Sequence, residues 1–207
     1  EFQRNKEYSA VIETVENRLL DIWNVRYIPV NKEPGGDQLP SFNDTQFQTR
    51  RLLMSSSSQN ASASVRYSVP DKRTTDIRII GWLKDSVDIP QGTVVGDIVL
   101  TESSGAQTRL PIKAGVDISD GAIDRPDNLA FAKHAKATVA FSMPEQRFNG
   151  AAYQEHLYYA DLLVPENKSL TVNKVQIDYT YPQGRLQVFG LTLYDGVAIK
   201  PLALNSF

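Results

Sequence analysis

Four aspartates and two glycines form the densest group of side chains in this sequence that could bind a ligand. They are Asp117, Asp120, Asp124 and Asp127, interleaved with Gly115 and Gly121. Carboxylate oxygens are preferred calcium ligands, so the sequence allows a metal site at the first three aspartates. Their spacing departs from the pattern of an EF-hand loop, however. The spacing therefore favours the alternative, in which the aspartates form turns, helix caps and an ion pair.

Arg125 is the second candidate, because it stands in an Asp-Arg-Pro sequence. A guanidinium group holds carboxylates or sugar hydroxyls in a fork geometry. Pro126 keeps the preceding residue out of helical geometry and so fixes the direction of Arg125. A purely structural fork that ties the loop to the domain is the favoured alternative.

A predicted strand over residues 153–161 forms the third candidate site. Strict alternation places five side chains on one face, namely Tyr153, Glu155, Leu157, Tyr159 and Asp161, and puts His156 on the other. Tyrosines and carboxylates can stack on a sugar and bind its hydroxyls. Tyr153, Glu155, Tyr159, Arg125 and His156 are therefore the predicted ligand-binding residues. A half-solvated sheet face without a ligand has the same composition and is the favoured interpretation.

Signals for an enzyme are weak. The two histidines, His134 and His156, have no metal-ligand spacing, and no serine stands in a Gly-x-Ser-x-Gly elbow. A polysaccharide hydrolase or lyase using Glu155, Tyr159 and His156 or Arg125 is one alternative, but its carboxylate separation cannot be obtained from sequence. No catalytic residue and no cofactor is predicted, apart from the calcium alternative.

Composition narrows the class of protein. The chain has 207 residues, 41% of them hydrophobic, a net charge of −2 and no cysteine. This composition argues against nucleic acid as a partner and excludes disulfides and thiolate metal sites. No apolar run approaches the roughly 20 residues of a membrane span. The chain begins with Glu1 and without a signal peptide, so we expect it to be part of a longer protein.

The elements that must position these residues are mostly strands. Alternation and turn signals predict strands over residues 24–30, 65–69, 76–83, 93–101, 107–113, 137–142, 150–164, 170–181 and 186–194. We expect Pro70 to end one strand, Val172 to point outward in another, and residues 130–134 to form a helical turn. This pattern predicts an antiparallel β-sandwich.

The amino end differs from the rest of the chain. An apolar stripe predicts an amphipathic helix over residues 5–23; it consists of Tyr8, Ile12, Val15, Leu19 and Ile22. We therefore expect one mainly β domain over residues 1–207. Residues 1–45 would be its appendage of helix, short strand and loop.

Several segments resemble YfhO-like and related glycosyltransferase-like bacterial membrane proteins. They are residues 21–28, the Pro-Gln-Gly-Thr-Val-Val-Gly-Asp-Ile block within 89–99, residues 110–117 followed by 122–126, and the closing segment 186–195. The first is similar to the segment that follows the last large hydrophobic region of those proteins. The others are similar to parts of their soluble carboxy-terminal domains, in the same order.

The resemblance implies a jelly-roll sandwich similar to galactose-binding-like domains. It implies an extracytoplasmic location, periplasmic or at the cell surface, with attachment to the membrane through another part of the polypeptide. A non-catalytic accessory role in cell-envelope glycan or glycolipid metabolism follows, with carbohydrate and the membrane-embedded part as partners. Some such sandwiches hold a structural calcium. A structural or protein-interaction domain without a ligand is the remaining alternative.

Overall fold

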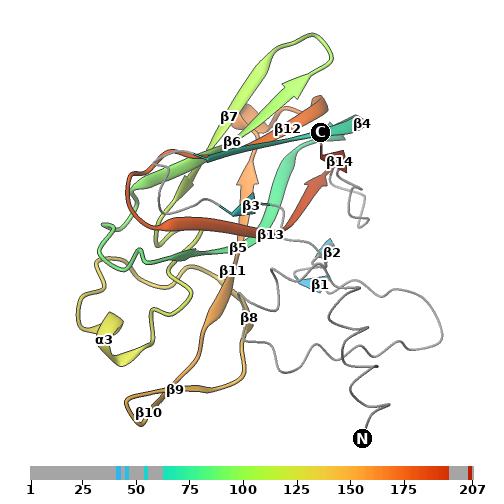
Figure 1. The fold of residues 1–207 in the computed structure, drawn as a ribbon. Helices are drawn as coiled ribbons and strands as arrows, with labels where there is room; N and C mark the ends of the chain where they lie inside the picture. The colour runs from blue at the N-terminus through green and yellow to red at the C-terminus, as the bar shows by residue number, and fades with distance from the viewer. Residues whose placement is uncertain (1–40, 43–44, 47–53, 56–62, 196–204, 207) are drawn as a thin grey trace, which may run out of the picture. The chain divides into compact units, whose positions relative to one another are not determined.

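The computed structural model describes residues 41–42, 45–46, 54–55, 63–195 and 205–206, which form a mainly β structure (Figure 1). By its contacts the chain divides into residues 1–38 and 39–207, and all described residues belong to the second unit. The predicted helix over 5–23 and strand over 24–30 lie outside the described residues. Among the described helices, none has the length and apolar character needed to span a membrane.

Two five-stranded sheets, both antiparallel, contain most of the described residues. The first has the order β3 (Met54–Ser55), β13 (Arg185–Tyr194), β5 (Asp76–Lys84), β11 (His156–Leu163) and β8 (Val139–Ser142). The second has the order β14 (Asn205–Ser206), β4 (Ala63–Thr74), β12 (Leu170–Tyr179), β6 (Val94–Glu102) and β7 (Gln107–Lys113). The predicted mainly β, antiparallel fold is confirmed.

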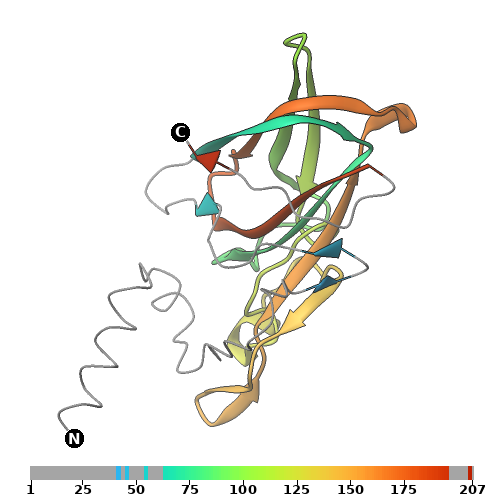
Figure 2. The same cartoon turned by 90° about the vertical axis from the view of Figure 1, so that its right-hand side faces the viewer.

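Smaller elements lie outside these sheets. They are the hairpin of β1 (Ser41–Phe42) and β2 (Thr45–Gln46), the hairpin of β9 (Gln146–Phe148) and β10 (Ala151–Tyr153), the helix α3 (Pro126–Leu129) and the 3-10 turn η1 (Pro165–Asn167). The β6–β7 hairpin projects at one end of the sheets, whereas α3 and the β9–β10 hairpin lie at the other (Figures 1 and 2).

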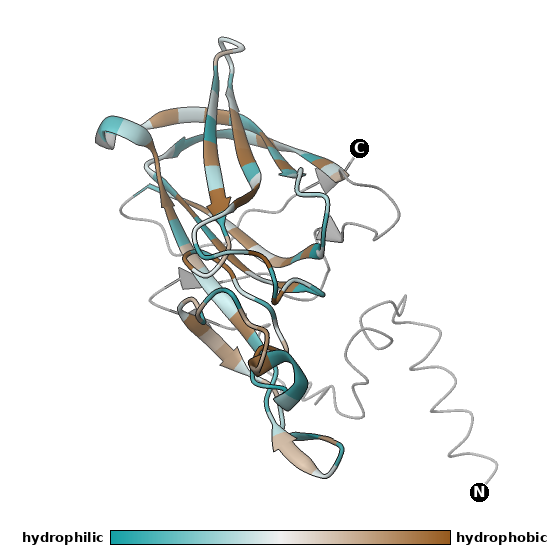
Figure 3. Ribbon diagram, turned by 90° about the vertical axis from the view of Figure 1, so that its left-hand side faces the viewer, coloured by the Kyte–Doolittle hydropathy of each residue, from teal (hydrophilic) through white to brown (hydrophobic). Residues whose placement is uncertain are grey.

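Alternating hydropathy explains most of the strands (Figure 3). In β12, buried Val175, Ile177 and Tyr179 alternate with more exposed polar residues. β5 is different, because every residue from Asp76 to Leu83 except Arg78 is buried. It pairs with β13 on one side and β11 on the other, so it is the central strand of the first sheet.

One bulge accounts for two wrong predictions in the second sheet. The β4–β12 register shifts between Val172 and Lys174, so the ladder is interrupted opposite residues 69–71 of β4. Pro70 lies in this gap, where its missing N–H costs no ladder bond, and β4 continues through it to Thr74. Opposite β6, the same stretch of β12 has one extra residue, which changes the face that its side chains occupy. Val172 is consequently buried instead of pointing outward.

Two further predictions are corrected in the part of the chain that follows β7. The strand predicted over 150–164 is two strands, β10 and β11, because the chain leaves regular pairing at Gln154 and Glu155. The helical turn is α3, which precedes the predicted residues 130–134. Pro126 opens α3 at the position where a missing N–H is tolerated, and Arg125 is extended, as Pro126 requires.

The carboxyl groups of Asp76, at the start of β5, and Asp161, in β11, form a pair. Arg78 Nε contacts both carboxylates, at 3.1 Å from Asp76 Oδ1 and 3.4 Å from Asp161 Oδ2. The guanidinium group of Arg78 also lies 3.6 Å from the ring centre of Tyr194. Burial and the neighbouring charge of Asp161 raise the pKa of Asp76 to about 6, against the influence of Thr75 and Arg78.

The raised pKa of Asp76 predicts a pH-dependent stability. Its ordinary value is 3.8, so the folded state favours the protonated form, and this stabilisation is lost as the pH rises from about 4 through about 6. Asp76→Asn removes the titration. We expect the variant to gain on the order of 2–3 kcal/mol relative to the wild type between pH 4 and pH 8. Urea unfolding at both pH values measures it, and a constant difference would contradict it.

Candidate functional site

Asp120 anchors the long loop that follows β7. Its side chain is buried, with 2% of the residue exposed. One carboxylate oxygen accepts hydrogen bonds from the backbone N–H and the hydroxyl of Ser86, both at 2.9 Å, and the other accepts from the N–H of Ala122 at 2.9 Å. Tyr158 donates to the Asp120 carbonyl oxygen at 2.9 Å. The donors of Ser86 and Ala122 offset the cost of burying this carboxylate.

The loop segment around Asp120 joins two strands of the first sheet. Leu83 N donates to Ser119 O, and Gly121 N donates to Leu83 O, both at 2.8 Å. On its other side, His156 N donates to Gly121 O, also at 2.8 Å. The loop therefore pairs with β5 beyond the point where the pairing of β11 with β5 ends. Gly121 is needed there, because a Cβ atom would lie 2.6 Å from the Trp82 ring.

His134 fixes the same loop from the far side. Its Nδ1 lies 2.8 Å from Ile89 O, which can only accept, so Nδ1 carries the proton. Its Nε2 lies 3.2 Å from the N–H of Asp120, which can only donate, so Nε2 accepts. His134 is therefore a neutral, structural histidine.

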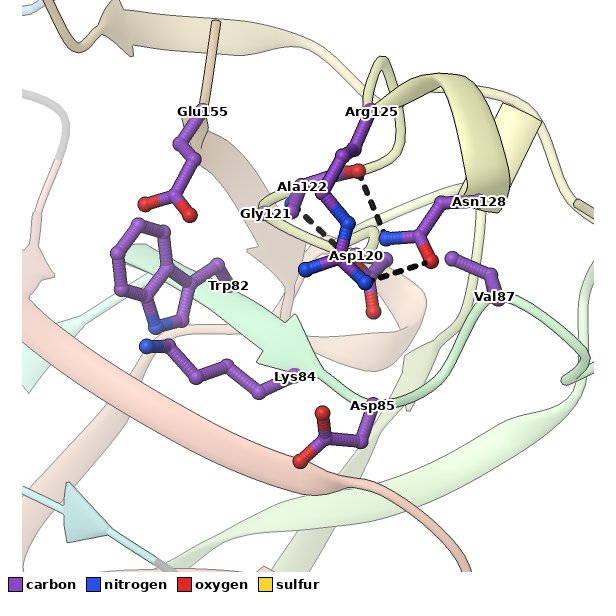
Figure 4. Close-up of a pocket in the computed structure, with 10 residues that line it drawn as sticks. All are labelled: Trp82, Lys84, Asp85, Val87, Asp120, Gly121, Ala122, Arg125, Asn128 and Glu155. Carbon is purple, nitrogen blue, oxygen red and sulfur yellow. Dashed lines mark hydrogen bonds between the residues drawn. The ribbon is translucent and has the colours of Figure 1, made fainter. Parts of the chain in front are cut away.

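An open polar pocket lies over this loop and the end of β5 (Figure 4). Its empty volume is about 460 Å³, including solvent at its mouth. The lining residues are Trp82, Lys84, Asp85, Val87, Asp120, Gly121, Ala122, Arg125, Asn128 and Glu155. Trp82 is only 1% exposed, and Lys84 Nζ lies 4.7 Å from its ring centre, so the indole is the floor of the pocket.

Two charged groups in the pocket lack a partner within the described part of the chain. Glu155 is half-buried, and its carboxylate makes no hydrogen bond or ion pair with a described residue; the ammonium group of Lys84 makes none either and lies over the Trp82 ring. Burial raises the pKa of Glu155 above its ordinary value, although the charge of Lys84 opposes the shift. Arg125 differs, because Asp127 pairs with its Nε at 2.7 Å and Asn128 accepts from its Nη2 at 3.2 Å. Glu155 and Lys84 are therefore available to a ligand.

A second cluster joins His156 to Asp124 and Ser142. His156 is 5% exposed; its Nε2 lies 2.8 Å from Asp124 Oδ2, and its Nδ1 lies 2.9 Å from Ser142 Oγ. Lys136 Nζ donates to both oxygens of Asp124, at 3.0 and 2.8 Å. Burial alone would raise the pKa of Asp124, but the bonds from Lys136 and His156 together hold it below its ordinary value.

The structure thus divides the predicted ligand-binding residues. Arg125 and Glu155 meet in the pocket, whereas His156 belongs to the second cluster. Tyr153 lies in an open depression with Asp124, lined also by Glu145, Ala152 and Gln154. Tyr159 is buried, and its hydroxyl is 3.4 Å from Asp161 Oδ2, beside the carboxyl pair and outside the pocket. Lys84, Asn128 and Ser142 were not predicted, because no local spacing marks them.

The aspartates of the long loop bind separate partners. Asp117 accepts from the N–H of Lys113 at 2.7 Å, and Asp127 pairs with Arg125. Asp120 and Asp124 are held as described above. Within the described residues, no group of three His, Asp or Glu side chains could hold a metal ion. The structural calcium stays a prediction, and these contacts do not support it.

Comparison of the chain with protein-family models, with curated proteins and with solved structures found no match. The function must therefore be argued from the geometry of the site.

Removal of the Asp120 carboxylate is expected to loosen the loop. Asp120→Ala leaves two donors of Ser86 and one of Ala122 without their acceptor, and we expect a loss of about 3 kcal/mol in the free energy of unfolding. Asp127→Ala is the matched control, since its ion pair with Arg125 is at the surface; we expect a much smaller loss. Denaturant unfolding of both variants is the measurement. Equal losses would show that Asp120 is not the anchor.

Calcium binding can be tested directly. Because the four aspartates have separate partners, we expect the melting temperature to be unchanged by millimolar calcium or by a chelator. A rise with calcium that the chelator reverses would establish a bound ion, since a ligand of the native state alone stabilises it.

Proposed function

We propose that this protein is an accessory domain that binds carbohydrate, without cleaving it, in the pocket lined by Lys84, Arg125 and Glu155. The observation that carries the proposal is the convergence on one open pocket of a carboxylate and an ammonium group that pair with no described residue. A sugar hydroxyl both donates and accepts hydrogen bonds. Glu155 would accept from one hydroxyl, while Lys84 and a free N–H of Arg125 would donate to others.

The side chains that line the pocket also suit a polar, neutral ligand. The lining carries charges of both signs, so it does not select strongly for an anion or a cation. The Trp82 ring forms a rigid floor. The guanidinium group of Arg125, which lies 5.0 Å from the Phe148 ring centre, forms a rigid wall. Since the indole is covered, we expect recognition mainly through hydrogen bonds and correspondingly modest affinity.

The wider setting rests on the resemblance to YfhO-like proteins. We propose that the two sheets form a jelly-roll sandwich of the galactose-binding-like type. In this proposal the domain lies on the extracytoplasmic side and is attached to the membrane-embedded part of its own polypeptide. Its ligand would then be a cell-envelope glycan or glycolipid.

The hydrolase alternative has less support from the pocket. A glycosidase needs a second carboxylate beside Glu155. Asp120 is fully occupied by three donors, and Asp85 pairs with Arg185. Neither group is free to act as a base or nucleophile, so binding without cleavage is the function that this geometry supports best.

A glycan array followed by calorimetric titration tests the binding proposal. We expect a dissociation constant in the millimolar range or below for at least one envelope saccharide. Glu155→Gln and Lys84→Met should each weaken binding by about tenfold or more, as for the loss of a charge-assisted hydrogen bond. Glu145→Gln, at the separate depression, is the matched control and should bind normally. Absence of binding to every saccharide, or equal losses in all three variants, would refute the proposal.

A further inference from the structure

Ser142 and His156 are direct cross-strand partners. They stand opposite each other in the β8–β11 register, at the end of the edge strand β8. Such partners have Cβ atoms close enough for their side chains to meet. The serine is exposed, whereas the histidine ring is 5% exposed, so the hydroxyl is the part of the pair that solvent reaches.

The hydrogen bonds give each group in the cluster a defined role. Asp124, held by Lys136, is an acceptor for the Nε2–H of His156. That bond orients the ring with its proton on Nε2, which leaves the Nδ1 lone pair directed at the Ser142 hydroxyl, 2.9 Å away. Serine, imidazole and carboxylate then form one relay in which the base is oriented by a third group. The two ring nitrogens have the opposite assignment to that in chymotrypsin-type triads.

We propose that Ser142 is a nucleophile activated by His156 and Asp124, and that it reacts with small carboxylic esters. The hydroxyl oxygen attacks the ester carbonyl carbon while its proton moves to His156 Nδ1. The C–O bond to the alcohol breaks, and the alcohol leaves with that proton. Water then attacks the acyl-serine through the same base, releasing the carboxylic acid and restoring the serine hydroxyl.

Oxyanion stabilisation limits this site. The N–H of Met143, the residue after the serine, already donates to Glu155 O at 2.8 Å. The side-chain amide of Gln154 has its Nε2 at a long 3.4 Å from Met143 O, and in this proposal it turns to donate to the oxyanion. One adaptable donor supports esters with good leaving groups rather than amides.

A fluorophosphonate probe and p-nitrophenyl acetate test the nucleophile. We expect peptide mass spectrometry to find the adduct on Ser142, formed about 100-fold faster than on Ser104, since a positioned base contributes at least that factor. Ser104 is the control because it is an exposed serine of the β6–β7 turn that contacts no histidine. Asp124→Asn should slow labelling at least about tenfold, while Asp127→Asn should leave it unchanged. Labelling of Ser142 no faster than of Ser104 would overturn the proposal.

A second measurement does not depend on the stability of the Asp124→Asn variant. The chain has no cysteine, so Ser142→Cys and Ser104→Cys each introduce a single thiol. A neighbouring imidazole favours the thiolate. We expect iodoacetamide to alkylate the first variant at least about tenfold faster at neutral pH. Equal rates would show that the Ser142–His156 bond is structural only.

Discussion

The buried Asp120 carboxylate is the interaction on which the candidate sites depend. It holds the loop between β5 and β11 through donors from two directions: Ser86 at the end of β5 and Ala122 within the loop itself. The buried carboxylate is tolerated in this position because N–H and O–H groups of Ser86 and Ala122 donate hydrogen bonds to it. The backbone on either side of Asp120 is thereby fixed, and Asp124 and Arg125 follow within one short turn.

The strands could be predicted from the sequence because their burial follows their hydropathy. The strand predicted over 107–113 agrees with β7, and the strands predicted over 76–83 and 186–194 agree with β5 and β13 within a residue. The prediction was wrong where a tertiary feature overrides local pattern. The bulge opposite Asn173 lets Pro70 stay inside β4, and nothing in the local sequence of either strand indicates where a ladder will slip.

The candidate sites were predictable only in part, for a related reason. Arg125 and Glu155 were identified by residue type, but their meeting in one pocket depends on how the loop packs against β11. The strand face drawn through Tyr153 and Tyr159 assumed one continuous strand. The break at Gln154 and Glu155 separates those two tyrosines. Ser142 became a candidate only through its register with His156, which is a long-range property of the sheet.

Two pairs of neighbouring residues connect the pocket to the Ser142 cluster. Asp124 and Arg125 are adjacent in the loop, and Glu155 and His156 are adjacent at the start of β11. In each pair one side chain lines the pocket and the other belongs to the cluster. Each site therefore shares its backbone with the other.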